Sequence, residues 1–200
     1  MPAVRRVARQ FRALPLPQSR KLLASPFNEE RLLALLILVD QYGRGDAGSR
    51  EAIHRAFLAD RARVNNWNLV DSSAPYILGA HLRDRPRRLL DSLAASSSLW
   101  DRRIAVLASA AFIRDGDPST TLRLVARLLA DREDLMHKAC GWMLREVGKR
   151  DLAVLEGFLR RHHAHMPRTM LRYAIERLPE MRRKAWLAGK VPGTESTAQA

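Results

Sequence analysis

The 200-residue sequence lacks the features that mark several common classes of protein. It has one cysteine, Cys140, so no disulfide can form within the chain, which is typical of proteins from a reducing compartment. No run of about 18 apolar residues occurs, and the apolar stretch at residues 32–39 is too short to span a membrane. The N-terminal arginines are not followed by the apolar core and cleavage site of a signal peptide. We therefore expect a cytoplasmic protein rather than a secreted or membrane-bound one.

The signatures of several enzyme and metal-binding classes are also missing. The glycines are scattered and form neither a phosphate-binding Walker loop nor a dinucleotide fingerprint, and no Gly-x-Ser-x-Gly elbow is present. Histidines cluster at residues 162–165 without a nearby cysteine and just before Met166-Pro167, so a helix-terminal role fits them better than metal binding. Cys140 fits a small buried residue better than a catalytic thiol. The sequence therefore predicts no metal ion and no cofactor.

Acidic residues are scarce relative to basic ones. The chain has 35 Lys and Arg against 21 Asp and Glu, a formal net charge of +14, and a pI of about 11.2. Such a charge favours a polyanionic partner, and the excess of arginine suits bidentate contacts with phosphate. An anionic membrane surface is a weaker alternative, because the basic residues are spread over many segments. The hydrophobic fraction of 46% is enough for a packed core.

Alternating strand patterns are rare, and Leu, Ala and Arg favour helix almost throughout. Prolines and glycines mark the joints between helices. Because Pro75 lies inside one of these segments, we expect that helix to kink or split there. We expect one helical domain over residues 1–188 and a polar tail over 189–200. The expected helices are 2–13, 17–24, 27–42, 48–60, 65–81, 86–96, 99–114, 118–130, 132–148, 151–162, 167–177 and 179–188.

Several helices resemble one another, with Arg103, Lys138 and Arg172 recurring at intervals of about 35 residues. This period predicts an all-α solenoid of the HEAT-like or armadillo type, with stacked antiparallel helix pairs; an irregular helical bundle stays open as the alternative. If the repeated helices line the inner side, their basic residues form a concave trough that follows a DNA backbone. The predicted trough contains Arg31, Arg103, Lys138, Arg145 and Arg172.

Trp67 and Asp71 are the most distinctive pair of side chains. Their i,i+4 spacing places an indole, which can accept a cation on its face, beside a carboxylate. Taken singly, Trp67 fits a core or interface aromatic and Asp71 fits a helix cap. Trp142 has a similar basic setting, and the preceding Gly141 lets another backbone or a ligand approach closely. Arg102 and Arg103 fit either surface ion pairs or phosphate contacts.

Four segments together carry a family resemblance. They are NNWNLVDSSA at 65–74, LWDRRIA at 99–105, HKACGWMLREVGK at 137–149 and MPRTMLRYAIE at 166–176. The chain resembles the AlkD-like DNA alkylation repair glycosylases, which are built from HEAT-like repeats. The resemblance implies an α-solenoid that excises cationic alkylated purines, 3-methyladenine and 7-methylguanine, from double-stranded DNA by base excision repair.

The resemblance also implies roles for individual residues. Asp71 matches the catalytic aspartate, Trp67 and Trp142 match the tryptophans that contact the lesion, and Arg103 matches an arginine that contacts the DNA backbone. We add the other basic residues of the repeated helices to the predicted backbone contacts: Arg102, Lys138, Arg145 and Arg172. The protein is expected to be a monomer associated with the nucleoid.

Two departures from the family pattern motivate an alternative function. Asn68 stands where family members usually have an aspartate after the first tryptophan, and the helices that usually precede the first repeat are reduced to Met1-Pro2. The alternative is a HEAT-repeat protein without glycosylase activity that recognises damaged or branched DNA by its shape.

Overall fold

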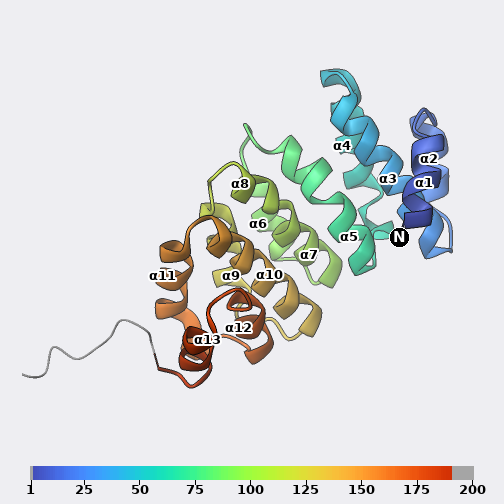
Figure 1. Cartoon of the computed structure of the whole chain (residues 1–200). Coiled ribbons are helices and arrows are strands. Elements are labelled where there is room, and N and C mark those ends of the chain that lie inside the picture. The colour runs from blue at the N-terminus through green and yellow to red at the C-terminus, as the bar shows by residue number, and fades with distance from the viewer. Residues whose placement is uncertain (1, 191–200) are drawn as a thin grey trace, which may run out of the picture.

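The computed structural model describes residues 2–190, and this part of the chain folds into helices without a strand (Figure 1). The order of the α-helices is α1 Pro2–Gln10, α2 Leu16–Leu23, α3 Asn28–Arg44, α4 Ala47–Ala59, α5 Trp67–Ser73, α6 Arg88–Ala94, α7 Leu99–Ala108, α8 Ala110–Arg114, α9 Ser119–Arg127, α10 Asp134–Arg150, α11 Leu152–His162, α12 Arg168–Ala174 and α13 Glu180–Leu187. Shorter turns are the 3₁₀ helices η1 Arg61–Arg63 and η3 His163–His165, and the π-helix η2 Pro75–Gly79.

Two expected helices are interrupted. The expected helix over 65–81 breaks after α5, and Gly79 donates its N–H to the carbonyl of Ala74, five residues back, at 2.9 Å. Proline has no N–H and its ring crowds the preceding turn, so the π turn at Pro75 confirms the predicted break. The expected helix over 99–114 divides at Ser109, whose hydroxyl donates to the carbonyl of Val106 at 2.6 Å.

Five helices pack side by side, each against the next: α3, α5, α7, α10 and α12. A second set covers them: α2 and α4 pack on α3, α6 packs on α7, and α11 packs on α10. Figure 1 shows the resulting succession of stacked helices from the N-terminus to α13. This arrangement confirms the predicted α-solenoid, and the repeated helices that carry Arg103, Lys138 and Arg172 are neighbours in one row. We call α3, α5, α7, α10 and α12 the central row.

Two glycines let neighbouring elements approach helices of this row closely. A Cβ on Gly141 would lie 2.5 Å from both the carbonyl oxygen of Met170 and the Cβ of Tyr173, so α10 meets α12 at that point. A Cβ on Gly79 would collide with the carbonyl of Ala108 at the end of α7. The expectation that Gly141 admits a second backbone is confirmed, and the contact sets the position of α10.

Cys140 lies next to this contact and is fully buried, as expected for a small packing residue. Burial raises the pKa of its thiol to about 12, so the reactive thiolate is not populated near neutral pH. No helix in the described residues is both long and apolar enough to cross a membrane. Of the predicted tail over 189–200, residues 191–200 lie outside the described residues.

Candidate active site

A buried ion pair joins two neighbouring helices of the central row. Asp71 of α5 accepts hydrogen bonds on both carboxylate oxygens from Arg103 of α7, from Nε and Nη2, each at 2.9 Å. The third guanidinium nitrogen, Nη1, donates to the carbonyl of Leu135 in α10 at 2.5 Å. Three helices are thus joined through one arginine. Two parallel N–H···O bonds fix both the position and the plane of the carboxylate.

The environment of Asp71 acts on its charge in two opposing ways. Burial raises the pKa of the carboxyl group because a charged group loses hydration there, whereas the hydrogen bonds and positive charge of Arg103 act to lower it. The Asp71 side chain is 16% exposed and that of Arg103 is 5% exposed. Because the guanidinium is always protonated, it supplies a permanent partner for the ionised carboxylate. Burial has the larger effect, so the pKa of Asp71 is raised on balance, and its carboxyl group is held in one position that solvent reaches over a small area.

Asp71 forms part of the wall of a cavity of about 150 Å³. Trp142 of α10 lies on the same wall and donates its indole N–H to Glu146, one turn further along the helix, at 3.0 Å. Lys149 holds the same carboxylate at 2.8 and 3.0 Å. The ring of Trp142 is therefore oriented from within α10. The lining comprises Asp71, Pro75, Tyr76, Leu107, Ala110, Ile113, Arg114, Trp142, Met143, Glu146 and Arg150.

Trp67 lies at the first turn of α5, and its side chain is 53% exposed. An exposed indole at the same helix face as Asp71 is available to a partner rather than used in the core. Asn66 occupies the N-cap position, but its side chain makes no capping bond and instead donates to Asn28 at 3.2 Å. The Oδ1 atom of Asn68 is buried and has no hydrogen-bond partner within the described residues.

The other predicted DNA-binding residues differ in whether an acidic side chain pairs with their charge. Arg102 is paired with Asp131 at 2.7 Å and also donates to the carbonyls of Ser96 and Ser97. Lys138 pairs with Asp134 in its own helix, and Arg145 pairs with Glu176 of the segment after α12. Arg172 is exposed, and no ion pair involves it within residues 2–190. The phosphate contacts predicted for these residues and for Arg103 stay predictions.

Three residues that the sequence did not single out surround the cavity. Arg114 lies at the end of α8 with its guanidinium 4.9 Å from the centre of the Tyr76 ring. Arg150 ends α10, and both arginines are exposed and form no ion pair among the residues described. Only the folding of three separate segments around one cavity brings them together. The sequence offered no specific signal for these two arginines, because arginine at the end of a helix is common.

The two carboxylates at this cavity are already engaged, Asp71 by Arg103 and Glu146 by Trp142 and Lys149. Neither carboxylate belongs to a cluster of potential metal ligands. Among the described residues one group of three such side chains occurs, and it lies elsewhere, at Glu51, His54 and His81. The cavity instead combines a fixed negative charge with an indole face. Such a combination is suited to a cationic ligand with an aromatic or planar part.

Comparison with known proteins gives a consistent result. Residues 1–178 match the family described as DNA alkylation repair enzyme. The structure is similar to that of a predicted DNA alkylation repair enzyme from Enterococcus faecalis, with a TM-score of 0.65 and 14% sequence identity over 88% of this chain and 82% of that chain. At that identity the likeness supports the fold alone. No protein with a curated description matches the chain.

Proposed function

We propose that this chain, which belongs to the DNA alkylation repair enzyme family, is a DNA glycosylase that hydrolyses the N-glycosidic bond of cationic alkylated purines in double-stranded DNA. The single observation that carries the proposal is the Asp71 carboxylate, fixed by Arg103 in the wall of a cavity that Trp142 also lines. The substrates are 3-methyladenine and 7-methylguanine. We further propose that it acts as a monomer associated with the nucleoid, without a cofactor.

The chemistry needs little from the protein at the leaving group. Alkylation at N3 or N7 makes the purine positively charged, so the base departs as a neutral molecule and no general acid has to protonate it. The electron pair of the bond from C1′ goes to the purine nitrogen, and positive charge develops on the deoxyribose ring. A carboxylate beside that ring stabilises the developing charge, as in glycoside hydrolysis. Water then adds to C1′ and loses a proton.

Arg103 contributes by holding Asp71 rather than by touching the lesion. Its two parallel hydrogen bonds keep the carboxylate in place before substrate binds, so little reorganisation is needed as charge develops. Its positive charge also weakens the field of Asp71, so the carboxylate attracts a full cation less strongly in the ground state. We assign Arg103 as a positioning residue for this reaction.

The tryptophans supply the aromatic surfaces that a cationic purine nucleotide needs. The exposed ring of Trp67 is on α5 and the oriented ring of Trp142 is on α10, and α7 packs between these two helices of the central row. Indole faces attract cations more strongly than other aromatic rings do. The backbone of the DNA lies along the row, where Arg172, Arg150 and, on the adjoining α8, Arg114 offer charges that no acidic group neutralises within residues 2–190.

The test is the timed release of 7-methylguanine from methylated duplex DNA. The Asp71→Asn variant keeps the shape of the side chain and loses its charge, so release should fall by about 100-fold or more while affinity for DNA changes by less than about threefold. Arg55→Ala, which alters an exposed arginine of α4, is the matched control and should keep wild-type release. Release by the wild-type protein no faster than from free DNA would refute the proposal.

Asn68, at the position where family members usually have an aspartate, motivates one second candidate, a DNA-binding protein without glycosylase activity. In that case Asp71 serves to join α5 to α7, and Asp71→Asn lowers the melting temperature without changing any rate of base release. Tight binding to branched or damaged DNA, with no excision, would establish this candidate. Measuring stability and release on the same variant separates the two.

A further inference from the structure

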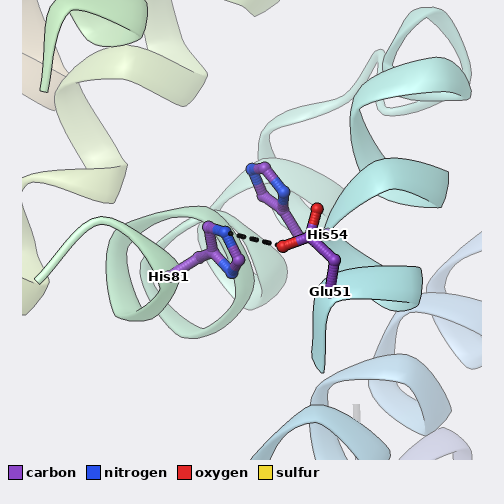
Figure 2. A group of neighbouring side chains, drawn as sticks. All are labelled: Glu51, His54 and His81. Atoms are coloured by element: carbon purple, nitrogen blue, oxygen red, sulfur yellow. Dashed lines mark ion pairs between the residues drawn. The ribbon is translucent and has the colours of Figure 1, made fainter. Parts of the chain in front are cut away.

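A group of three side chains outside the proposed active site has the composition of a metal site. Glu51 and His54 lie one turn apart on α4, and His81 lies in the helical turn that follows η2 (Figure 2). One donor atom from each side chain lies within 4.8 Å of the other two. We propose that Glu51, His54 and His81 bind a divalent transition-metal ion such as Zn²⁺.

The ring nitrogens of His54 are the first argument. Both are buried and have no hydrogen-bond partner in the described structure. A buried polar atom without a partner costs stability, and most such atoms are satisfied by protein, water or an ion. The ring is stacked on that of His81, with the centroids 3.6 Å apart and the planes at 6°. A neutral imidazole can donate a ring-nitrogen lone pair to a metal ion.

The other two side chains are held from behind, as metal ligands usually are. Arg55 donates to Oε1 of Glu51 at 2.7 Å, which leaves Oε2 directed to His81, 3.5 Å from its Nε2 atom. The hydroxyl of Tyr42 lies 3.2 Å from Nδ1 of His81. If that nitrogen carries the proton and donates to Tyr42, then Nε2 presents its lone pair to the site. Figure 2 shows His81 facing Glu51 from the neighbouring helix.

The donor set selects the class of ion. Two imidazoles and one carboxylate match Zn²⁺ and similar ions of the first transition series, with water as a further ligand, whereas Ca²⁺ and Mg²⁺ prefer oxygen ligands. Tetrahedral coordination with bonds of about 2.1 Å places donors about 3.4 Å apart. The donors of Glu51 and His81, 3.5 Å apart, already fit this spacing, and the distances to the donor of His54, within 4.8 Å, must close by up to about 1.4 Å. Side-chain rotation about single bonds supplies such a shift. A surface hollow of about 410 Å³ that reaches His81 provides a route from solvent.

The positive charges around the site leave Oε2 of Glu51 and the ring nitrogens of both histidines free of guanidinium contacts. Arg55 is engaged by Glu51, Arg85 donates to the carbonyl of His81 at 2.9 Å, and Arg50 donates to the carbonyl of Tyr42 at 3.1 Å. Each guanidinium thus has an acceptor of its own. The ion would tie α4 to the segment that begins at Asp71 and ends at His81. Its role is to stabilise the packing between these elements.

The experiment uses the full chain, produced without a polyhistidine tag, freed of metal by a chelator and titrated with Zn²⁺ in a calorimeter. We expect one ion per chain and a rise in melting temperature of about 5 °C or more at saturating Zn²⁺. The variants His54→Gln and Glu51→Gln, which keep the approximate size of the side chains, should each weaken binding at least tenfold. His81→Gln should do the same.

His165→Gln is the matched control, because His165 lies in the other group of histidines, at the exposed turn η3. It should bind Zn²⁺ as the wild type does, and so should Asp71→Asn, which separates this proposal from the glycosylase. Co²⁺ in place of Zn²⁺ should give visible absorption bands that disappear in His54→Gln. The proposal is overturned if the metal-free chain binds no Zn²⁺, or if His165→Gln rather than His54→Gln abolishes binding.

Discussion

The helical segment from Trp67 to His81 carries a polar centre at each end, and the two centres are built in opposite ways. At Asp71 every oxygen of the carboxylate has a donor, and the cation that neutralises it belongs to the chain. Near His81, His54 has two buried nitrogens without partners in the described residues, and the cation that contacts this group, Arg55, bonds only the outer oxygen of Glu51. At the first centre the charge of Asp71 is paired within the chain, and the second centre has room for an added cation.

The difference explains why we assign different roles to similar residue types. A carboxylate fixed by an internal guanidinium can act on a charge that appears only briefly, because its position does not depend on the ligand. The two buried ring nitrogens of His54 gain a partner only when an ion is bound. The first arrangement suits catalysis on a cationic substrate. The second suits a structural ion.

The largest expected effect is the loss of the internal cation. Arg103→Ala leaves the Asp71 carboxylate buried without a partner and the carbonyl of Leu135 without its donor. The free energy of unfolding should therefore fall by about 3–5 kcal/mol. Arg55→Ala removes the mostly exposed partner of Glu51 and should cost about 1 kcal/mol or less. Urea unfolding of both variants measures the two values. Equal losses of unfolding free energy in the two variants would contradict the distinction between a centre whose charges are paired within the chain and one that lacks a cation.

A smaller effect should follow from crowding the contact between α10 and α12. Gly141→Ala places a methyl group against Met170 and Tyr173 and should lower stability by about 1–3 kcal/mol. The shift of α10 should also displace Trp142 and slow base release, but leave Zn²⁺ binding at His54 unchanged. Gly157→Ala, in α11, adds its methyl to open space and should be neutral or stabilising by up to about 1 kcal/mol. Circular dichroism during heating and the release assay provide the readouts.

The smallest effect concerns the charges at the rim of the cavity. Arg150→Ala should weaken binding to duplex DNA a few-fold, since Arg150 is exposed and has no acidic partner in the described part of the chain. The slope of log affinity against log salt concentration should become shallower by about one. Lys184→Ala, which alters an exposed lysine on α13, should leave both unchanged. Fluorescence anisotropy at several salt concentrations measures them. The same response from both variants would mean that binding follows net charge rather than this cavity.

Much of the fold could be predicted because helix formation depends on local signals. Prolines and glycines sit at the joints, so most of the expected helices agree with the structure to within a few residues, and the break at Pro75 was predicted from the missing N–H. The recurrence of Arg103, Lys138 and Arg172 predicted neighbouring helices, because a repeat of about 35 residues stacks like units side by side. The interruption at Ser109 was not predicted, because it depends on a hydroxyl that bonds to a nearby carbonyl.

The candidate sites were predictable to different degrees. Asp71, Trp67 and Trp142 stand in segments with a recognisable order, and the family is confirmed over residues 1–178. The sequence did not show that Arg103 turns inward to Asp71, because an arginine at this position suits a surface ion pair or a phosphate contact equally well. The spacing of Glu51 and His54 was a signal for a metal site, but a weak one without a third ligand.

By itself, the sequence determined that this chain is helical, repetitive, basic and equipped with an aspartate and tryptophans in a family-specific order. Helix periodicity, breakers and net charge are properties of neighbouring residues or of the whole composition, so they need no tertiary structure. Only the tertiary structure decided which charges meet: Arg103 reaches Asp71 across 32 positions of sequence, and His81 stacks on His54 from another helix. Contacts between distant segments depend on how helices stack, and that depends on packing such as the close approach at Gly141.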